Sequence, residues 1–246
     1  MSTKTLFLAW QEKEKRQWFP VGRLDADVKG SLYRFRYIGG AKRAGKDAGF
    51  EPLLDFPSLL KDYRSSELFP LFRNRVIAPG RSDRAEYLTN LDLPEHAGPV
   101  EILSVNGGSR VTDAYEVFPE LVKRADGSFT CRFFLHGWRH VNQSAQERID
   151  RLTKDEKLYV TLELTNPTTA LAVQIQTTDY HMIGWAPRYL VADLVKAMAE
   201  SPLYAAHVVR VNPQPAPSKQ RVLIEMMGRW EAHKPMNNAD FEPLVS

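Results

Sequence analysis

The first forty residues contain three short runs rich in apolar positions, separated by polar segments. Residues 5–10 (TLFLAW) and 18–24 (WFPVGRL) are short, mainly apolar runs, and residues 31–38 (SLYRFRYI) show a period of two; all three are typical of β-strands. The charged segment QEKEKRQ separates the first two runs, and Gly39-Gly40 follows the third as a candidate turn. The pattern predicts a three-stranded antiparallel meander.

The third run places aromatic side chains on one face and arginines on the other. Tyr33, Phe35 and Tyr37 alternate with Arg34 and Arg36. A face of aromatic and basic residues is one way to bind nucleic acid. The simpler interpretation, which we favour, is that the aromatic rings enter the core and the arginines face solvent.

Residues 50–95 have a different character, with prolines that exclude one long helix in FEPLLDFP. Leucine- and phenylalanine-rich pieces predict short helices or turns, and residues 81–91 predict a further helix that ends before Pro94. The segment EHAGP at 95–99 is the predicted boundary. We therefore expect two domains, a small meander and helical subdomain over 1–95 and a second domain over 96–246.

The second domain has more predicted strands than helices. Residues 100–119 predict a hairpin around Asn106-Gly107-Gly108, because an Asn-Gly turn supplies the positive φ angles of a tight hairpin. Strands are also predicted at FTCRFFLHG, EKLYVTLEL, ALAVQIQT and YHMIGWAP, and a last hairpin at HVVRV and RVLIEMMGRW. QSAQERIDRL predicts a helix capped by Ser144, and PRYLVADLVKAMAES an amphipathic helix. The fold class expected is α+β, mainly antiparallel β.

The composition is that of a globular protein with a mild positive charge. The 246 residues are 43% hydrophobic and 26% charged, and the net charge is +3. This balance permits a nucleic-acid partner without requiring one. We expect no membrane association, because no uncharged apolar stretch approaches about 18 residues. The first apolar run has five residues, too few for a secretory signal, so we expect a cytoplasmic protein.

Motifs that carry catalytic chemistry are missing from the sequence. It contains no phosphate-binding loop, no dinucleotide fingerprint, no nucleophile elbow and no zinc-protease helix. Cys131 lies near His136 and His140, and a Cys–His pair can be a nucleophile. However, Cys131 alternates with Phe133 as the inward face of a strand, which favours a buried core thiol. The two histidines flank Gly137-Trp138, a poor arrangement for metal ligation. We expect no enzyme activity, no metal and no cofactor.

Three separate motifs follow one another between residues 130 and 200. They are GWRH at 137–140, ELTNP followed by ALAV at 163–173, and IGWAPRYLVADL at 183–194. Their order and spacing resemble those of the HIRAN domain. The chain departs from the family pattern between Asn166-Pro167 and Ala170, where Thr-Thr is two residues shorter and lacks the family's Asp and Asn.

This resemblance implies an OB-like β-barrel that binds single-stranded DNA, notably a DNA 3′ end. Arg139 and His140 match the family's Arg–aromatic pair, which contacts phosphate and stacks on a base. Asn166 matches the Asn of the binding loop, which reads a base edge or the terminal hydroxyl. The predicted nucleic-acid-binding residues are Trp138, Arg139, His140, Asn166, Thr168 and Thr169.

Residues 5–95 carry a second resemblance. VGRL, YRFRY, PLLDFP and LFPLFRNRV, in which Phe72 and Asn74 occupy an F-x-N position, are similar to the N-terminal subdomain of HipA-type kinases. In split systems of that family such a subdomain acts as the antitoxin of a separate kinase. Two hypotheses follow: a non-catalytic module that binds single-stranded DNA, or an adaptor that docks a HipA-type kinase through residues 1–95.

Overall fold

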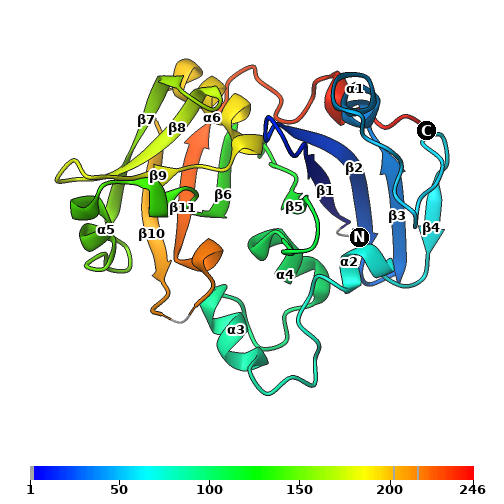
Figure 1. Cartoon of the computed structure of the whole chain (residues 1–246), viewed down its shortest axis with the longest axis horizontal. Coiled ribbons are helices and arrows are strands. Elements are labelled where there is room, and N and C mark those ends of the chain that lie inside the picture. The colour runs from blue at the N-terminus through cyan, green and yellow to red at the C-terminus, as the bar shows by residue number, and fades with distance from the viewer. Residues whose placement is uncertain (1–2, 202, 215) are drawn as a thin grey trace. The chain divides into compact units, whose positions relative to one another are not determined.

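The computed structural model describes residues 3–201, 203–214 and 216–246, which fold into two compact units (Figure 1). Unit 1 runs to Thr89 and adds Leu93–Glu120 and Met236–Ser246; unit 2 comprises Asn90–Asp92 and Leu121–Pro235. The main division therefore falls after Glu120 and not at the expected boundary near residue 95. The reason is that the strand Tyr115–Pro119 pairs with the first strand of the chain.

Unit 1 is built on one antiparallel sheet. Its strands are β1 (Lys4–Gln11), β2 (Trp18–Asp27), β3 (Leu32–Tyr37), β4 (Tyr63–Ser65) and β5 (Tyr115–Pro119), in the order β4-β3-β2-β1-β5. The predicted meander is confirmed as β1, β2 and β3. Gly39-Gly40 is not a turn, because it begins helix α1 (Gly39–Ala48).

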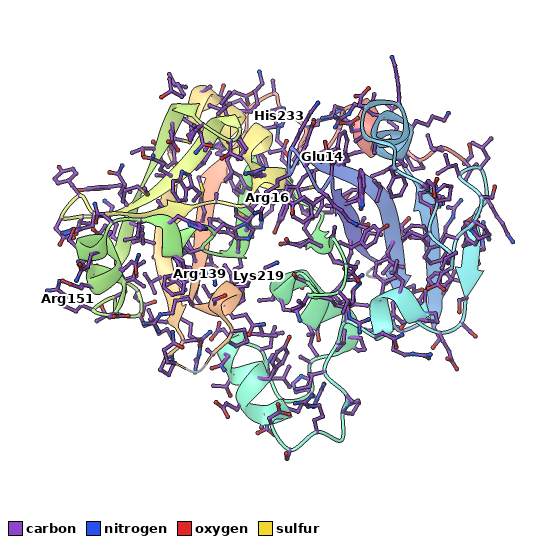
Figure 2. The ribbon with its side chains drawn as sticks, in the orientation of Figure 1. Glu14, Arg16, Arg139, Arg151, Lys219 and His233 are labelled. Atoms are coloured by element: carbon purple, nitrogen blue, oxygen red, sulfur yellow. The ribbon has the colours of Figure 1, made fainter. Side chains whose placement is uncertain are left out.

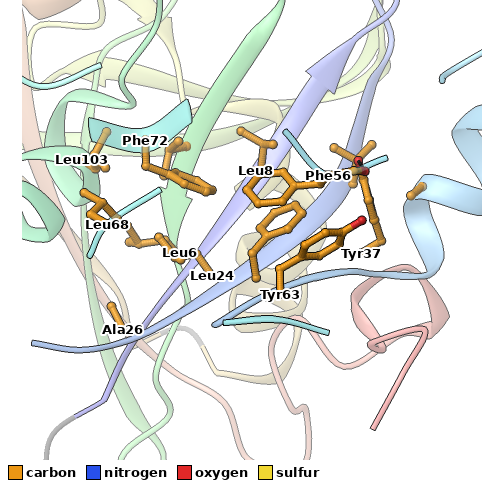
Figure 3. Packing of buried hydrophobic residues seen from close by; sticks show 14 of the residues in the cluster. Leu6, Leu8, Leu24, Ala26, Tyr37, Phe56, Tyr63, Leu68, Phe72 and Leu103 are labelled. Atoms are coloured by element: carbon orange, nitrogen blue, oxygen red, sulfur yellow. Dashed lines mark hydrogen bonds between the residues drawn. The ribbon is translucent and has the colours of Figure 1, made fainter. Parts of the chain in front are cut away.

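The aromatic face of β3 lies in the core of unit 1 (Figure 3). Phe35 is fully buried and stacks on Phe56 with 4.0 Å between ring centroids, and the Tyr37 hydroxyl donates to the Phe56 carbonyl at 2.8 Å. On the opposite face Arg34 and Arg36 form ion pairs with carboxylates of the same unit. The expected placement of the rings is confirmed, whereas Arg36 is mostly buried in its ion pair and does not face solvent as expected.

Residues 100–106 are helical, so the predicted hairpin at this position is wrong. Helix α4 (Pro99–Asn106) has Pro99 at its first position, and the Glu101 side chain accepts from the Gly98 N–H at 3.0 Å. Gly107 ends the helix with a φ of 70°, so the glycine that was expected in a hairpin turn is a helix C-cap. A short apolar run is compatible with either structure, and here the caps decide.

The other helices of unit 1 are short. They are α2 (Pro70–Arg73), α3 (Arg84–Asn90) and the 3₁₀ turn η3 (Ala239–Phe241); α3 begins three residues later than expected. Phe72 of α2 is fully buried and Asn74 is the C-cap of this helix. The resemblance of this region to the HipA subdomain stays a prediction.

Unit 2 contains a six-stranded antiparallel sheet. Its strands are β6 (Ser128–Phe134), β7 (Lys157–Asn166), β8 (Ala170–Thr177), β9 (Met182–Trp185), β10 (Ala205–Val211) and β11 (Val222–Arg229), in the order β6-β11-β10-β7-β8-β9. All of these strands were predicted. Phe129, Cys131 and Phe133 are buried on one face of β6, which confirms the core thiol, and burial raises the Cys131 pKa to about 12.

The two edges of this sheet meet at one point. His136, just after β6, and Trp185, at the end of β9, exchange two backbone hydrogen bonds of 2.9 Å each. Among the described residues this contact is a single bridge and not a ladder of paired residues. The fold class is α+β with mainly antiparallel sheets, as expected. The OB-like closed barrel stays a prediction.

Two α-helices accompany the sheet. Helix α6 (Arg188–Glu200) follows Pro187 and packs on β8 and β11, as its amphipathic pattern predicts. Helix α5 (Gln143–Ile149) is capped by Asn142, whose side chain accepts from the Ala145 N–H at 2.9 Å, and not by Ser144 as expected. Asn is as good an N-cap as Ser, and it lies one residue before the helix begins.

Candidate nucleic-acid interface

The segment after β6 turns at Gly137, whose backbone lies against the ring of Trp185. Gly137 has a φ of 69°, and a Cβ atom at this position would lie 2.5 Å from the Trp185 ring. Only glycine satisfies both conditions. The turn then closes into the 3₁₀ helix η1 (Trp138–His140), which holds three of the predicted site residues.

Trp138 anchors this turn to a segment eighty residues away. Its indole Nε1 donates to the carbonyl oxygen of Ser218 at 2.7 Å, and the side chain is half-buried. Ser218 begins the 3₁₀ helix η2 (Ser218–Gln220), so the bond brings Lys219 to the neighbourhood of Arg139, as Figure 2 shows. In this structure Trp138 serves as an anchor, and its expected contact with nucleic acid stays a prediction.

Arg139 and His140 are both exposed. Neither side chain forms a hydrogen bond or an ion pair with another of the described residues. Their backbone is fixed, because the His140 N–H donates to the Gly137 carbonyl at 2.8 Å and the side chain of Gln146 donates to the Arg139 carbonyl at 3.4 Å. The Arg139 guanidinium and the His140 imidazole therefore face solvent from a backbone that hydrogen bonds fix in place.

Two cationic residues act on His136, which precedes this turn. Burial lowers the pKa of His136 to about 4, and the charges of Lys219 and Arg188 lower it further in the same direction. His136 is therefore neutral at neutral pH, with Lys219 and Arg188 as the charged residues that act on it. Lys219 from η2 and Arg188 from the start of α6 thus both act on the residue that precedes Gly137.

Asn166, Thr168 and Thr169 form the turn between β7 and β8. Oδ1 of Asn166 accepts from the N–H groups of Thr168 and Thr169 at 3.0 and 3.1 Å and from the Thr169 hydroxyl at 3.0 Å. Its Nδ2 donates to Glu163 at 2.9 Å. Both ends of the Asn166 amide are used within the turn, which explains how the short Thr-Thr loop closes without the family's Asp.

Trp185 joins the two predicted parts of the site. Its Nε1 donates to Oε2 of Glu163 at 2.7 Å, and the same oxygen accepts from Asn166. These hydrogen bonds hold the pKa of Glu163 below its usual range, and the bond from Asn166 has the larger effect. A continuous series of contacts therefore runs from Gly137 through Trp185 and Glu163 to Asn166.

The structure thus keeps Trp138, Arg139 and His140 together and connects them to Asn166 through residues that were not predicted. The unpredicted residues are His136, Glu163, Trp185, Arg188 and Lys219. Trp185 and Arg188 lie in the motif IGWAPR, so a sequence signal for them existed. Lys219 has no such signal, because its segment is brought here by contacts distant in sequence, among them the Trp138–Ser218 hydrogen bond.

Comparison with known proteins agrees with the motif series. Residues 128–231 match the model of the HIRAN domain. This part of the chain is thus similar to the HIRAN domain. The match confirms the predicted resemblance and extends beyond residues 130–200, and it includes β6 to β11, η1 and Lys219.

Other comparisons add little to this. Among solved structures, the crystal structure of a protein from Lactobacillus plantarum, a structural genomics target, is 14% identical, with a TM-score of 0.33; it covers 43% of this chain and 100% of its own. No curated protein matches the chain. In the part of the chain that the structure describes, no helix has the length and hydropathy of a membrane span, and no three His, Cys, Asp or Glu side chains gather as metal ligands would.

Proposed function

We propose that the HIRAN-like part of this chain binds single-stranded DNA at the turn Trp138–His140, as a non-catalytic accessory module. The observation that carries the proposal is the exposed Arg139, without an ion pair among the described residues, on a turn that the Trp138–Ser218 hydrogen bond holds next to the segment of Lys219. The HIRAN match supports a nucleic-acid ligand.

The chemistry of these groups suits a flexible polyanion. A guanidinium donates two parallel hydrogen bonds to a phosphate, and an ammonium beside it adds a point charge. The exposed imidazole of His140 offers a planar ring on which a base stacks, worth about 1–3 kcal/mol per base. Any base can stack on this ring, provided that it is unpaired. The site therefore recognises single strands and does not depend on their sequence.

The test is a titration of a fluorescent single-stranded oligonucleotide, followed by anisotropy at low salt. The double variant Arg139→Ala, His140→Ala is expected to bind about tenfold more weakly or worse, because it removes one phosphate contact and one stacking ring. Arg151→Ala is the matched control: Arg151 is an exposed arginine near the end of α5, well separated from Arg139 in Figure 2. Wild-type protein that binds no single strand, forked end or duplex ends this proposal.

Salt dependence gives a second, independent measure. For single strands the slope of log K against log salt is about −0.7 for each phosphate neutralised. Arg139→Ala should therefore reduce the magnitude of this slope by about 0.7, whereas Arg151→Ala leaves it unchanged. An unchanged slope in Arg139→Ala means that the guanidinium is not a phosphate contact.

A further inference from the structure

Two tyrosines stand exposed at the end of the β7–β8–β9 sheet away from the Asn166 turn. Tyr159 of β7 is 36% exposed and Tyr180, between β8 and β9, is 77% exposed. Their ring centroids are 5.8 Å apart with an interplanar angle of 37°. Large aromatic rings at this exposure contribute little to the core, so a different reason for their presence is needed.

The backbone at Tyr180 strengthens this argument. Tyr180 has a φ of 66°, in the left-handed region that glycine and asparagine occupy at low cost and a bulky residue does not. The turn is held by the Tyr180 N–H, which donates to the Thr177 carbonyl at 3.0 Å. A tyrosine placed here costs stability and gains little burial, which is typical of a residue kept for what its side chain binds.

The tyrosines share one sheet face with the candidate interface. Along β7 the side chains of Tyr159, Thr161 and Glu163 alternate to the same face, and Glu163 holds the indole of Trp185. The neighbouring strand continues this face, since Nε2 of Gln176 donates to the Thr161 hydroxyl at 3.2 Å. Four residues of a strand span about 13 Å, so both ends fall within one strand-binding site of about 4–16 nucleotides.

A lysine ammonium lies beside the ring of Tyr159. Nζ of Lys157 lies 6.0 Å from the centroid of the Tyr159 ring, within reach of a phosphate whose base stacks there. Asp179, next to Tyr180, forms an ion pair of 3.0 Å with Arg148, which also pairs with Glu156. The Lys157 ammonium and the two rings thus form a stacking platform with its own cation.

We propose that Tyr159 and Tyr180 form a second contact for the same single strand, which stacks bases of a longer ligand beyond the Arg139 turn. This inference rests on the proposed function and defines the ligand further: the chain prefers single strands long enough to reach both places. Short strands engage the turn alone.

The test compares single strands of about 4 and about 12 nucleotides by anisotropy. In Tyr159→Thr with Tyr180→Asn the rings are lost, while the new residues suit a strand and a left-handed turn. We expect this variant to bind the longer strand about tenfold more weakly and the shorter one as wild type does. Tyr159→Phe with Tyr180→Phe keeps the rings and should retain both affinities.

The outcomes separate this inference from the proposed function. If the Thr and Asn variant, shown to be folded by circular dichroism, binds the longer strand as tightly as wild type, the platform is refuted and the Arg139 site stands. An equal loss for both lengths also refutes the platform. If wild-type protein binds neither length, the proposed function fails and the platform fails with it.

Discussion

The indole of Trp185 donates a 2.7 Å hydrogen bond to the carboxylate of Glu163, and this bond links the end of β9 to strand β7. The same indole lies against Gly137, at the start of the turn that presents Arg139. Trp185 is therefore a positioning residue. It packs against the start of the Trp138–His140 turn and connects this turn, through Glu163, to Asn166.

Glu163→Ala should lower the free energy of unfolding by about 1–2 kcal/mol, because Trp185 and Asn166 lose a charged acceptor. The folded-state pKa of Glu163 is depressed, so the carboxylate contributes fully above the usual pKa of a glutamate, about 4.3, and its contribution is lost as the pH falls through the folded value. Urea denaturation of both proteins over an acidic pH series checks this. A difference that does not shrink with falling pH contradicts the role of the charge.

Lys219→Ala should raise the pKa of His136 from about 4 towards its ordinary value, because one of the two repelling cations is removed. Burial remains, so the value stays below about 6.5. Since the folded pKa is the lower one, the unfolded chain binds the proton first, and wild type loses stability as the pH falls from about 6.5 towards about 4. The variant should lose less over this window. An NMR titration of the histidine ring protons measures the shift; no shift means that Lys219 does not act on His136.

Gly184→Ala should destabilise unit 2 by about 2–3 kcal/mol. Gly184 has a φ of 150°, and a Cβ atom there would lie 2.5 Å from the carbonyl oxygen of His136, which is backbone and part of the bridge between the sheet edges. Gly80→Ala is the control, since nothing lies within 4 Å of its added Cβ, and it should change stability by less than about 0.5 kcal/mol. Thermal unfolding decides; equal effects at both positions contradict the close approach.

A phosphate added to the 3′ end of the oligonucleotide should leave its affinity unchanged. The Asn166 amide is the group expected to recognise a terminal hydroxyl, and its Oδ1 and Nδ2 are both engaged within the β7–β8 turn. Anisotropy with hydroxyl-ended and phosphate-ended strands of one sequence compares the two. A clear preference for the free hydroxyl shows that Asn166 leaves its turn on binding.

Much of unit 2 could be predicted because its strands carry local signals. Alternation identifies β6, β7 and β8, and Pro187 with the amphipathic pattern identifies α6. The apolar residues 100–105 could not be resolved in this way, because a short buried helix and a buried strand present the same run. The boundary was misplaced for a related reason: the pairing of β5 with β1 joins residues more than a hundred positions apart.

The order of the GWRH, ELTNP and IGWAPR motifs was enough to indicate the resemblance to the HIRAN domain, since it is a linear property of the chain. The contacts of each side chain in the site could not be predicted from the sequence. The fold turned the Asn166 amide inward to its own loop, anchored Trp138 on Ser218, and set Lys219 and Arg188 beside His136. Hydrogen bonds and electrostatic interactions depend on separations of a few ångströms in space, and only the folded backbone sets those separations.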